Sequence, residues 1–486
     1  MKIFFGIFSL GFLLVVSSAP LAPTGQSNFS LSYSISKFNS KFFEKICQAE
    51  DGNIFYSPFS IHMLLSQVYL GSPKNSTTNQ ELASLLELKQ DDTPALLNSY
   101  LQARTSQELA LSQLTNGSIV RIANKLYAAE KISIKRRFIN SLEKNFKTLM
   151  ERVNFANSDE TAGKINSFVK NQTNGLITKI IDAGDIDGLS SLVLVNAIYF
   201  KGNWKHPFEK NETKLETFFV DGSTSTNFSA MTLTAEFKMI RVNEIEAEVI
   251  QLPYVNDKIS MVIILPDKKS TVRQVETKLE DFDSTSLLEK VDSAVGSPVR
   301  LVLPKFETSF EVQDLEKMLV SLGLSTLFEP TKSNLSNISD QPLYVSKMSH
   351  KAVVKVNEEG SEAAAVTSVE IGIRATPGEF IVNRPFIFYI VDRQSNVPLF
   401  VGRIVDPNGN LKLRPNVVPS SGETIVRSGV VVEDPCDALG YNSTSVSPDS
   451  IHLPCPGHDT ANLKGYQEKQ ESLKSQRLEE FNNRQS

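Results

Sequence analysis

Cysteine is scarce in this chain of 486 residues, which contains three: Cys47, Cys436 and Cys455. A disulfide-rich scaffold needs a denser, even-numbered set, so that class of protein is excluded. Cys436 and Cys455 lie close enough in sequence to close a small loop by a disulfide, and Cys47 is then expected to be a buried free thiol. Neither "PCDALGY" nor "LPCPGHDT" contains a C-x-x-C pair or a four-ligand set, so no metal site is expected.

Histidine and the common catalytic motifs are also lacking. The chain has five histidines and no G-x-S-x-G, H-E-x-x-H or G-x-x-x-x-G-K-[ST] segment. No pair of carboxylates is spaced as an acid/base dyad, and His350, just before the strand pattern "KAVVKV", is best interpreted as a hydrogen-bonded structural imidazole. We therefore expect no catalytic residues and predict that the protein is not an enzyme.

Positive charge is not in excess. The net charge is −5 and the isoelectric point about 5.8, so the sequence predicts neither a nucleic-acid partner nor a polybasic membrane anchor. An apolar content of 41% with 22% charged residues is ordinary for a globular protein. At this length the chain could form two or three domains, or one large body with appendages.

The N-terminus has the pattern of a signal peptide. "MKIFFGIFSLGFLLVVSSAPLAPTG" begins with a basic residue, continues with a short apolar run and ends in small residues. We expect residues 1–19 to be the signal peptide, with cleavage between Ser18 and Ala22, and 20–30 to be a short N-terminal segment. No later segment is apolar for long enough to cross a bilayer. The sequence thus predicts a secreted, extracellular protein.

Asparagine triplets of the N-x-[ST] type fit that prediction, although any one of them can arise by chance. Nine occur, at Asn28, Asn75, Asn116, Asn171, Asn211, Asn227, Asn334, Asn337 and Asn442. We expect a glycoprotein.

Between these ends, the chain alternates helix and strand patterns without regular βαβ order. "LSYSISKFNSKFFEKIC" has apolar residues at helical spacing, and in "NIFYSPFSIHMLLSQVYLG" a short strand is followed by a helix that Ser57 caps, with Pro58 in its first turn. "GSIVRIANKLYAAE", "SLVLVNAIYFKGNW", "ISMVIILPD" and "VRLVLPKFETSFEV" have strand patterns. A strand that is apolar almost throughout is covered on both faces. The sequence therefore predicts one large α+β body.

The composition changes after Pro407. Residues 408–486 are turn-rich and then almost entirely polar, ending in "NLKGYQEKQESLKSQRLEEFNNRQS". Too few apolar residues remain there to bury a helix face. We interpret this C-terminal extension as largely disordered, and a solvated terminal helix is the alternative.

The least distinctive segment, "EEGSEAAAVTSVEIGIRATPG" from Glu358 to Gly378, lies between two strand patterns. An alanine-rich helix capped by Ser361 and an exposed linker are two interpretations. The third is a strand, in which alternate residues point to opposite faces. One face would then carry the small, uncharged residues Ser361, Ala363, Ala365, Thr367 and Val369, while the other would carry Glu362, Ala364, Val366, Ser368 and Glu370. Such a segment can enter a sheet without burying a charge, with Gly360 as its hinge.

Several long motifs in order, from Leu31 to Pro407, are similar to those of the serpins. "NIFYSPFSI" resembles the family's shutter segment, "INSFVKNQTNGLI" the helix over its main sheet, and "LVNAIYFKGNW" its central strand. "SHKAVVKVNEEGSEAAA" resembles the strand and hinge, and "FIVNRPFIFYIVD" with "PLFVGRIVDP" the C-terminal signature. The resemblance implies a serpin fold: a large central mixed or antiparallel sheet, further sheets, about eight or nine helices and an exposed reactive loop. Its shutter and breach residues would be Asn53, Ser57, Ser60, Asn196, Trp204 and His350, and its hinge and inserting residues Glu358, Gly360, Ser361, Glu362, Ala363, Ala364, Ala365 and Thr367.

The resemblance also implies a suicide-substrate mechanism. A protease attacks the exposed loop and forms an acyl-enzyme, and the freed loop inserts into the central sheet before the acyl bond is hydrolysed. The family's loop spacing places the scissile residue at Gly360 plus 14, which is Arg374, and counting back from Pro385 agrees (385 − 374 = 11). The predicted scissile bond is thus Arg374–Ala375. An arginine there suits a protease with an acidic specificity pocket. The expected partner is therefore an extracellular trypsin-like serine protease, bound in a covalent complex.

The hinge favours an inhibitor over a non-inhibitory relative. Neither a proline nor a charge on the inserting face occurs from Gly360 to Ile373, and either would obstruct insertion. A carrier or storage serpin and a cross-class inhibitor of cysteine proteases are the alternatives. A heparin-like cofactor is not supported, because "TPALLNSYLQARTSQ" carries a single basic residue, Arg104. We expect a monomer without nucleic-acid or membrane partners.

Overall fold

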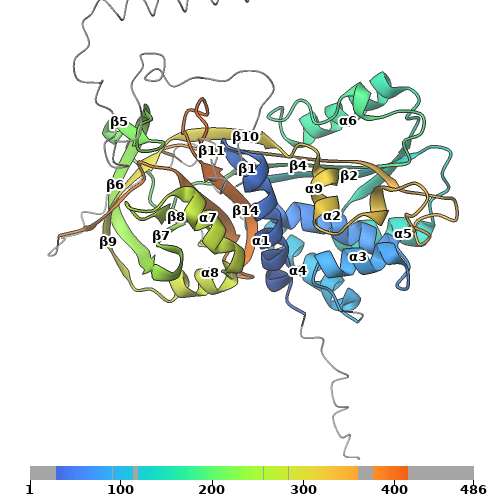
Figure 1. Cartoon of the computed structure of the whole chain (residues 1–486), viewed down its shortest axis with the longest axis horizontal. Coiled ribbons are helices and arrows are strands. Elements are labelled where there is room, and N and C mark those ends of the chain that lie inside the picture. Colours follow the sequence, from blue (N-terminus) through green and yellow to red (C-terminus); the bar gives the residue numbers. More distant parts are fainter. Residues whose placement is uncertain are drawn as a thin grey trace, which may run out of the picture. The chain divides into compact units, whose positions relative to one another are not determined.

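Among the described residues, helices are concentrated in the N-terminal part of the chain and strands in the part that follows (Figure 1). The structure, a computed structural model, describes residues 29–89, 91–112, 119–255, 257–282, 284–359 and 376–413. The α-helices of the described residues are α1 (Leu31–Ala49), α2 (Pro58–Gly71), α3 (Thr77–Leu85), α4 (Thr93–Ser112), α5 (Arg136–Ser141), α6 (Ser158–Gln172), α7 (Val272–Asp281), α8 (Ser284–Asp292) and α9 (Leu315–Ser321). The predicted α+β architecture, with its number of helices, is confirmed.

One sheet has five strands in the order β10-β11-β4-β2-β3. These are β10 (Phe306–Glu311), β11 (Val345–Val356), β4 (Leu192–Lys201), β2 (Ile119–Ala129) and β3 (Leu149–Val153). The sheet is mixed, because β11 is parallel to β4 and β3 to β2, while the other neighbours are antiparallel. All but the last residue of β4 is buried, as its continuous apolar run predicts for a strand covered on both faces.

The second sheet has nine strands, in the order β1-β14-β13-β8-β7-β6-β9-β12 with β5 paired to β6. They are β1 (Ile54–Tyr56), β14 (Val397–Ile404), β13 (Phe386–Asp392), β8 (Ile259–Pro266), β7 (Ala247–Pro253), β6 (Ser225–Val242), β9 (Gly296–Pro304), β12 (Gly378–Ile381) and β5 (Lys214–Phe219). Helices α7 and α8 pack against β6, β7 and β8 (Figure 1).

The segment "VRLVLPKFETSFEV", which the sequence presents as one strand, is two strands in different sheets. It divides at Pro304 and Lys305, between β9 in the large sheet and β10 in the small one. Proline cannot donate a hydrogen bond to a ladder, so it marks a natural end for strand pairing. This division brings Lys305 to the point where the two sheets meet.

Helix α2 lies in the core and packs against β4 of one sheet and β14 of the other. Ser57 caps it as predicted, because its hydroxyl accepts a hydrogen bond from the Ser60 N–H at 3.1 Å, and Pro58 occupies the first turn. All of its residues except Leu70 are buried, including the polar His62 and Gln67, so the core encloses the helix on all sides.

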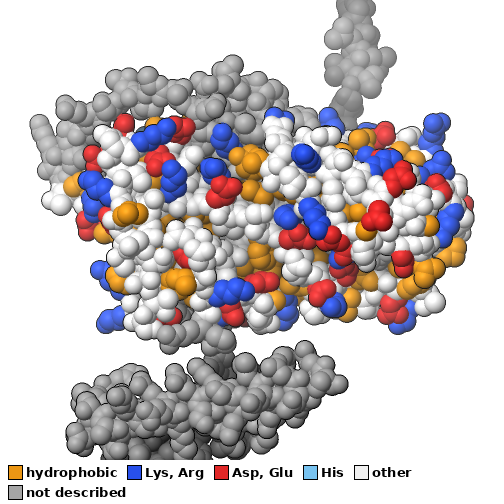
Figure 2. All heavy atoms as spheres, turned by 90° about the horizontal axis from the view of Figure 1, so that it is seen from above, with side chains coloured by type: hydrophobic (Ala, Val, Ile, Leu, Met, Phe, Trp, Pro, Cys, Tyr) orange, Lys and Arg blue, Asp and Glu red, His pale blue; other side chains and the backbone are white. Residues whose placement is uncertain are grey.

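Acidic and basic side chains are interspersed over the face seen in Figure 2. Ion pairs between surface side chains include Arg241 with Asp267 and Lys278 with Glu246. Among the described residues, no helix is both long and apolar enough to cross a membrane.

Candidate functional site

The candidate site is the seam between β4 and β11. The two strands pair in parallel from Leu192 and Val345 to Phe200 and Val354, with one irregularity near Val345. Strand β11 leads at its C-terminal end directly into Asn357. The chain that follows is the predicted hinge, so the segment predicted to insert starts at the end of one of the two paired strands.

Glu358 is the one predicted loop residue that the structure places. The other hinge and inserting residues lie outside the described residues, as does the predicted scissile pair: Gly360, Ser361, Glu362, Ala363, Ala364, Ala365, Thr367, Arg374 and Ala375. The described chain resumes at Thr376, just before β12.

A chain of hydrogen bonds crosses the seam at mid-strand. The backbone N–H of Ser57 donates to His350 Nε2 at 3.0 Å, and His350 Nδ1 lies 2.5 Å from Asn196 Oδ1. Because a backbone N–H can only donate, Nε2 is the acceptor and the proton is on Nδ1, which donates to Asn196. The Asn196 amide then donates to Asn124 Oδ1 on β2. The start of α2 and strands β11, β4 and β2 are thus joined through one imidazole.

The His350 imidazole is neutral. It is completely buried, and this desolvation lowers its pKa from 6.5 to about 3. A second proton would have to go on Nε2, which would break the bond from Ser57. The sequence predicted a structural imidazole before a strand, but β11 begins five residues earlier, at Val345, so His350 lies inside the sheet.

Two other predicted shutter residues, Ser60 and Asn53, are not part of this chain of hydrogen bonds. Ser60 lies in the first turn of α2, and its buried hydroxyl finds no hydrogen-bond partner within the described part of the chain. Asn53 contacts another part of the chain: its amide donates to the Asp406 carbonyl at 2.7 Å, and its Oδ1 accepts from the N–H groups of Val405 and Asp406. Asn53 therefore holds the segment after β14 rather than the seam.

Trp204 and Glu358 lie near the C-terminal end of the seam. The Trp204 indole N–H donates to the Asn357 carbonyl at 2.9 Å, and its ring stacks on Tyr254 with centroids 4.5 Å apart. The backbone N–H of Phe208 donates to the Glu358 carbonyl at 2.9 Å. The segment after β4 thus holds the chain that leaves β11 by two backbone carbonyls.

The Glu358 carboxylate is held by two further side chains. Lys305 Nζ lies 3.0 Å from one carboxylate oxygen, and the Thr213 hydroxyl donates to the other at 3.0 Å. Burial on its own would raise the pKa of Glu358, but hydrogen bonds from its own backbone N–H, Lys305 and Thr213 bring that pKa below its usual value. The carboxylate is 7% exposed, so it is charged and paired in a nearly dry position.

Sequence reasoning missed Lys305, Thr213, Phe208 and Asn124. Each lies at least 50 residues from its partner in the site, as with Lys305 and Glu358 (53) or Asn124 and Asn196 (72). No local sequence pattern predicts a contact between residues so far apart in the chain. The one available signal was Pro304, which marks the strand end that exposes Lys305.

The other predicted positions fall into three groups. Asn75, Asn171, Asn211, Asn227 and Asn334 are exposed, whereas the Asn337 amide donates to the Leu70 and Ser72 carbonyls, at 3.2 and 2.9 Å. Cys47 is buried and free. The remaining positions lie outside the described residues: Asn28, Asn116, Asn442, Cys436 and Cys455. Within the described ranges, no three His, Cys, Asp or Glu residues gather as a metal site.

Comparisons with known proteins agree in one family. The family model described as Serpin (serine protease inhibitor) matches residues 33–407. Serpin B11 of Mus musculus is 34% identical over 374 residues, which are 73% of this chain and 93% of the relative. Serpin B4 of Homo sapiens is 34% identical, over 78% of this chain and all of the relative. Among solved structures, uncleaved ovalbumin is similar with a TM-score of 0.68 and 27% identity, over 78% of this chain and all of ovalbumin.

The prediction of a secreted, extracellular protein is wrong. The similar relatives, Serpin B11, B6, B3 and B4, belong to clade B, the intracellular branch of the family. These relatives also give no support to a signal peptide or to glycosylation. The apolar N-terminus and the asparagine triplets are local patterns that a chain can carry without being exported.

The family model spans more than half of the chain, and relatives above 30% identity are covered over nearly their whole length. The fold is similar to that of uncleaved ovalbumin, as the TM-score shows. The chain belongs to the serpin family, whose members are generally protease inhibitors rather than enzymes.

Proposed function

We propose that this serpin inhibits trypsin-like serine proteases as a suicide substrate, with cleavage at Arg374–Ala375. The protease serine attacks the Arg374 carbonyl, the bond to Ala375 nitrogen breaks, and an acyl-enzyme forms. The freed loop then enters the five-stranded sheet as a new strand between β4 and β11, carrying the protease with it.

The direct pairing of β4 with β11 is the observation that carries this proposal. Each strand has the other as its neighbour, so the position that an inserted strand would take is closed. The hinge continues from the end of β11, one of the two strands that must separate. Insertion would add a strand, with its backbone hydrogen bonds, to this sheet. The uncleaved state is then metastable relative to the inserted state, and inhibition depends on the relative rates of insertion and hydrolysis.

Few side-chain interactions would have to break for β4 and β11 to separate. His350 joins β11 to β4 by one side-chain hydrogen bond, and the Glu358 carboxylate is released if its bonds to Lys305 and Thr213 break. The alternation from Ser361 to Val369 would place small uncharged side chains inward as the loop enters. Arg374 suits a protease pocket with a buried carboxylate.

The test is incubation of the full chain with bovine trypsin. We expect a complex that survives SDS, a new fragment beginning at Ala375, and no such complex with Arg374→Ala. Thermal unfolding provides an independent readout, because the cleaved, inserted form should unfold at a higher temperature than the uncleaved one. Cleavage without a covalent complex and without that rise in temperature would refute the inhibitor mechanism.

Two variants that differ in one position separate insertion from general damage to the loop. Ala363→Arg places a charge on the inserting face and should turn the inhibitor into a substrate, because the charge would have to enter the sheet interior. Ala364→Arg places the same charge on the opposite face and should inhibit nearly normally. Equal stoichiometries of inhibition in the two variants would contradict the predicted alternation.

A further inference from the structure

Strand β6 has a gap along one of its edges. At Ala230 it pairs with Lys214 of β5 on one edge and with Pro304 of β9 on the other. At Lys238 it pairs with β7 and again with β9. Strands β5 and β7 therefore lie on the same edge, opposite β9. Between them, among the described residues, Met231–Phe237 have no partner strand on that edge.

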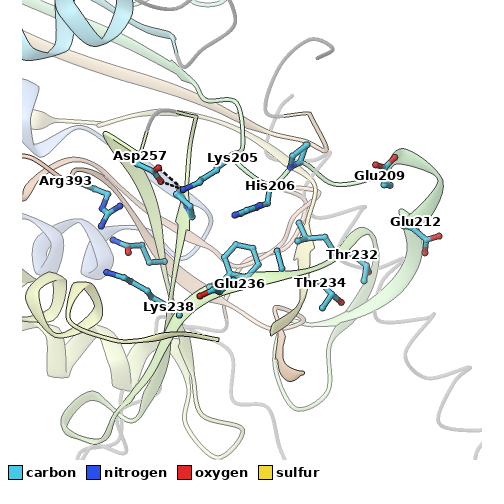
Figure 3. A pocket seen from close by; sticks show the side chains of 17 residues that line it. Lys205, His206, Glu209, Glu212, Thr232, Thr234, Glu236, Lys238, Asp257 and Arg393 are labelled. Atoms are coloured by element: carbon cyan, nitrogen blue, oxygen red, sulfur yellow. Dashed lines mark hydrogen bonds and ion pairs between the residues drawn. The ribbon is translucent and has the colours of Figure 1, made fainter. Parts of the chain in front are cut away.

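The gap opens into a cavity of about 750 Å³, within the range that small ligands occupy (Figure 3). Consecutive residues of β6, Thr232–Lys238, line it. Since neighbouring side chains point to opposite faces of a sheet, an unbroken run of lining residues means that the backbone edge itself borders the cavity. This edge offers N–H and C=O groups in the spacing of a strand.

The outer wall is Lys205–Thr213, the segment between β4 and β5. At one end the Lys205 N–H donates to the Pro253 carbonyl of β7 at 3.0 Å, and at the other Thr213 leads into β5. The wall bridges the two strands that flank the gap. Phe208 and Thr213 of this wall are bonded to Glu358.

Charges of opposite sign lie at the two ends of the cavity (Figure 3). Lys205, Lys238 and Arg393 are at the end near β7, and Glu209 and Glu212 are at the end near β5. The basic end also contains two acids: Lys205 pairs with Asp257 at 2.7 Å, and Asp292 is shared by Arg393 at 2.7 Å and Lys238 at 3.7 Å. The two acids near β5 are exposed; Glu212 lies 3.6 Å from Lys214, and the structure gives Glu209 no ion-pair partner among the described residues.

The middle of the cavity has an apolar surface beside the polar side chains of Thr234 and Glu236. His206 lies edge-on to the buried Phe237 ring, with centroids 5.8 Å apart and planes at 87°. Leu233 and Ala235 add aliphatic surface. The pKa of His206 is lowered by burial and by the neighbouring Lys205, so the ring is neutral at physiological pH and adds no charge to the centre.

We propose that this cavity binds a short extended peptide that pairs with the free edge of β6. Strands β5, β7 and β9 are all antiparallel to β6, so a peptide that continues their line is antiparallel as well. Its N-terminal residue then lies at the Lys238 end and is acidic, its centre is apolar, and its C-terminal residue lies at the Glu212 end and is basic. Seven unpaired residues span about 24 Å at ~3.4 Å per residue, enough for about five peptide residues.

Occupation of the cavity should also affect the reactive loop, a consequence that rests on the proposed function. The wall that would contact the peptide is the segment that holds the Glu358 carbonyl through Phe208 and its carboxylate through Thr213. A bound peptide keeps that wall in place. We therefore expect slower loop insertion and a higher stoichiometry of inhibition when the peptide is bound.

Binding is tested with acetyl-Glu-Val-Thr-Val-Lys-amide and the full chain. Trp204, the single tryptophan, lies next to the wall and stacks on Tyr254, so its fluorescence reports binding, with calorimetry as a second measurement. Two control peptides have the same composition or length: acetyl-Lys-Val-Thr-Val-Glu-amide reverses the charges, and a version with N-methylated valines removes backbone donors. We expect both to bind at least tenfold more weakly.

Charge variants of the protein give the matched comparison. Lys238→Gln should weaken binding of acetyl-Glu-Val-Thr-Val-Lys-amide at least threefold. Lys317→Gln removes an exposed lysine on α9 outside the cavity and should leave that affinity unchanged. Glu212→Gln at the other end serves if Lys238→Gln does not fold. Equal affinity for the two peptide orders, or no binding at millimolar concentration, would overturn the site.

The inhibition assay separates the two proposals. If the peptide binds but trypsin forms no SDS-stable complex with or without it, the site stands and the proposed function fails. If the complex forms and the peptide does not bind, the function stands and the site fails. If the peptide binds without changing the stoichiometry of inhibition, the coupling through Glu358 is refuted.

Discussion

Acid should lower the stability of the folded protein, because His350 takes up a proton much more readily in the unfolded chain. The imidazole is neutral in the folded protein, where its pKa is about 3, and has an ordinary pKa of 6.5 when the chain is unfolded. The unfolded state therefore binds a proton more readily, and folding stability falls as the pH is lowered. This contribution is fully present above pH 6.5 and is lost progressively as the pH falls toward 3.

The size of the effect follows from the two pKa values. Between pH 8 and pH 5, the unfolded imidazole becomes protonated over about 1.5 units while the folded one stays neutral, which costs about 2 kcal/mol at 1.36 kcal/mol per unit. His62 is buried in the same way, with a pKa of about 3, between Ser34 and Tyr100. The two histidines together should cost about 4 kcal/mol over this range.

Urea unfolding at the two pH values measures this, with the free energy of the first cooperative transition as the readout. His350→Gln should lower stability at pH 8 by about 1–3 kcal/mol, because a buried hydrogen-bond partner is lost. Its further loss between pH 8 and pH 5 should be about 2 kcal/mol smaller than that of the wild type. His62→Gln is the matched control, since it removes an equal titration away from the seam. If wild type and His350→Gln lose the same stability on acidification, the buried neutral imidazole is refuted.

Three further predictions concern single side chains. Glu358→Gln should destabilise the uncleaved form by about 1–2 kcal/mol, a modest value because the partner Lys305 is 45% exposed. If the Lys305–Glu358 ion pair belongs to the uncleaved state, the loss of stability should be smaller in the cleaved protein. Gly402→Ala should cost about 3 kcal/mol in thermal unfolding, since a Cβ there would overlap a buried phenylalanine ring, whereas Gly163→Ala, with open space in α6, should stabilise by about 0.5–1 kcal/mol. Burial, and then a nearby glutamate, raise the pKa of Cys47. In a variant that lacks the other two cysteines, this thiol should not react with Ellman's reagent at pH 8 until the protein unfolds. Rapid reaction of the native protein would show instead that the thiol is accessible.

Much of the fold was predictable because its signals are local. The Ser57 cap, the apolar run of β4 and the helical spacing of α1 each reflect physics within one or two turns or a single strand. The prediction of secretion failed for a related reason. A charged start, an apolar run and small residues satisfy a local rule, but the similar relatives contradict the destination that it indicates.

The site was predictable only in part. The sequence indicated His350 and Glu358, and it indicated the alternating small residues after Gly360. It did not indicate that the His350 proton is on Nδ1, because that depends on a donor 293 residues away at Ser57. Nor did it indicate the gap in β6, which exists because β5 ends its pairing at Ala230.

The sequence by itself indicated most of the helices and strands and the family, and it supplied the prediction of Arg374 as the scissile residue, since propensity, periodicity and motif order are all properties of neighbouring residues. Only the tertiary structure decided which strands meet. It closed β4 on β11, brought Lys305 to Glu358 and left one edge of β6 free. Pairing between strands distant in sequence is fixed by burial of both sheets on one core and not by any segment's own preference, so it could not be read from the segments one at a time.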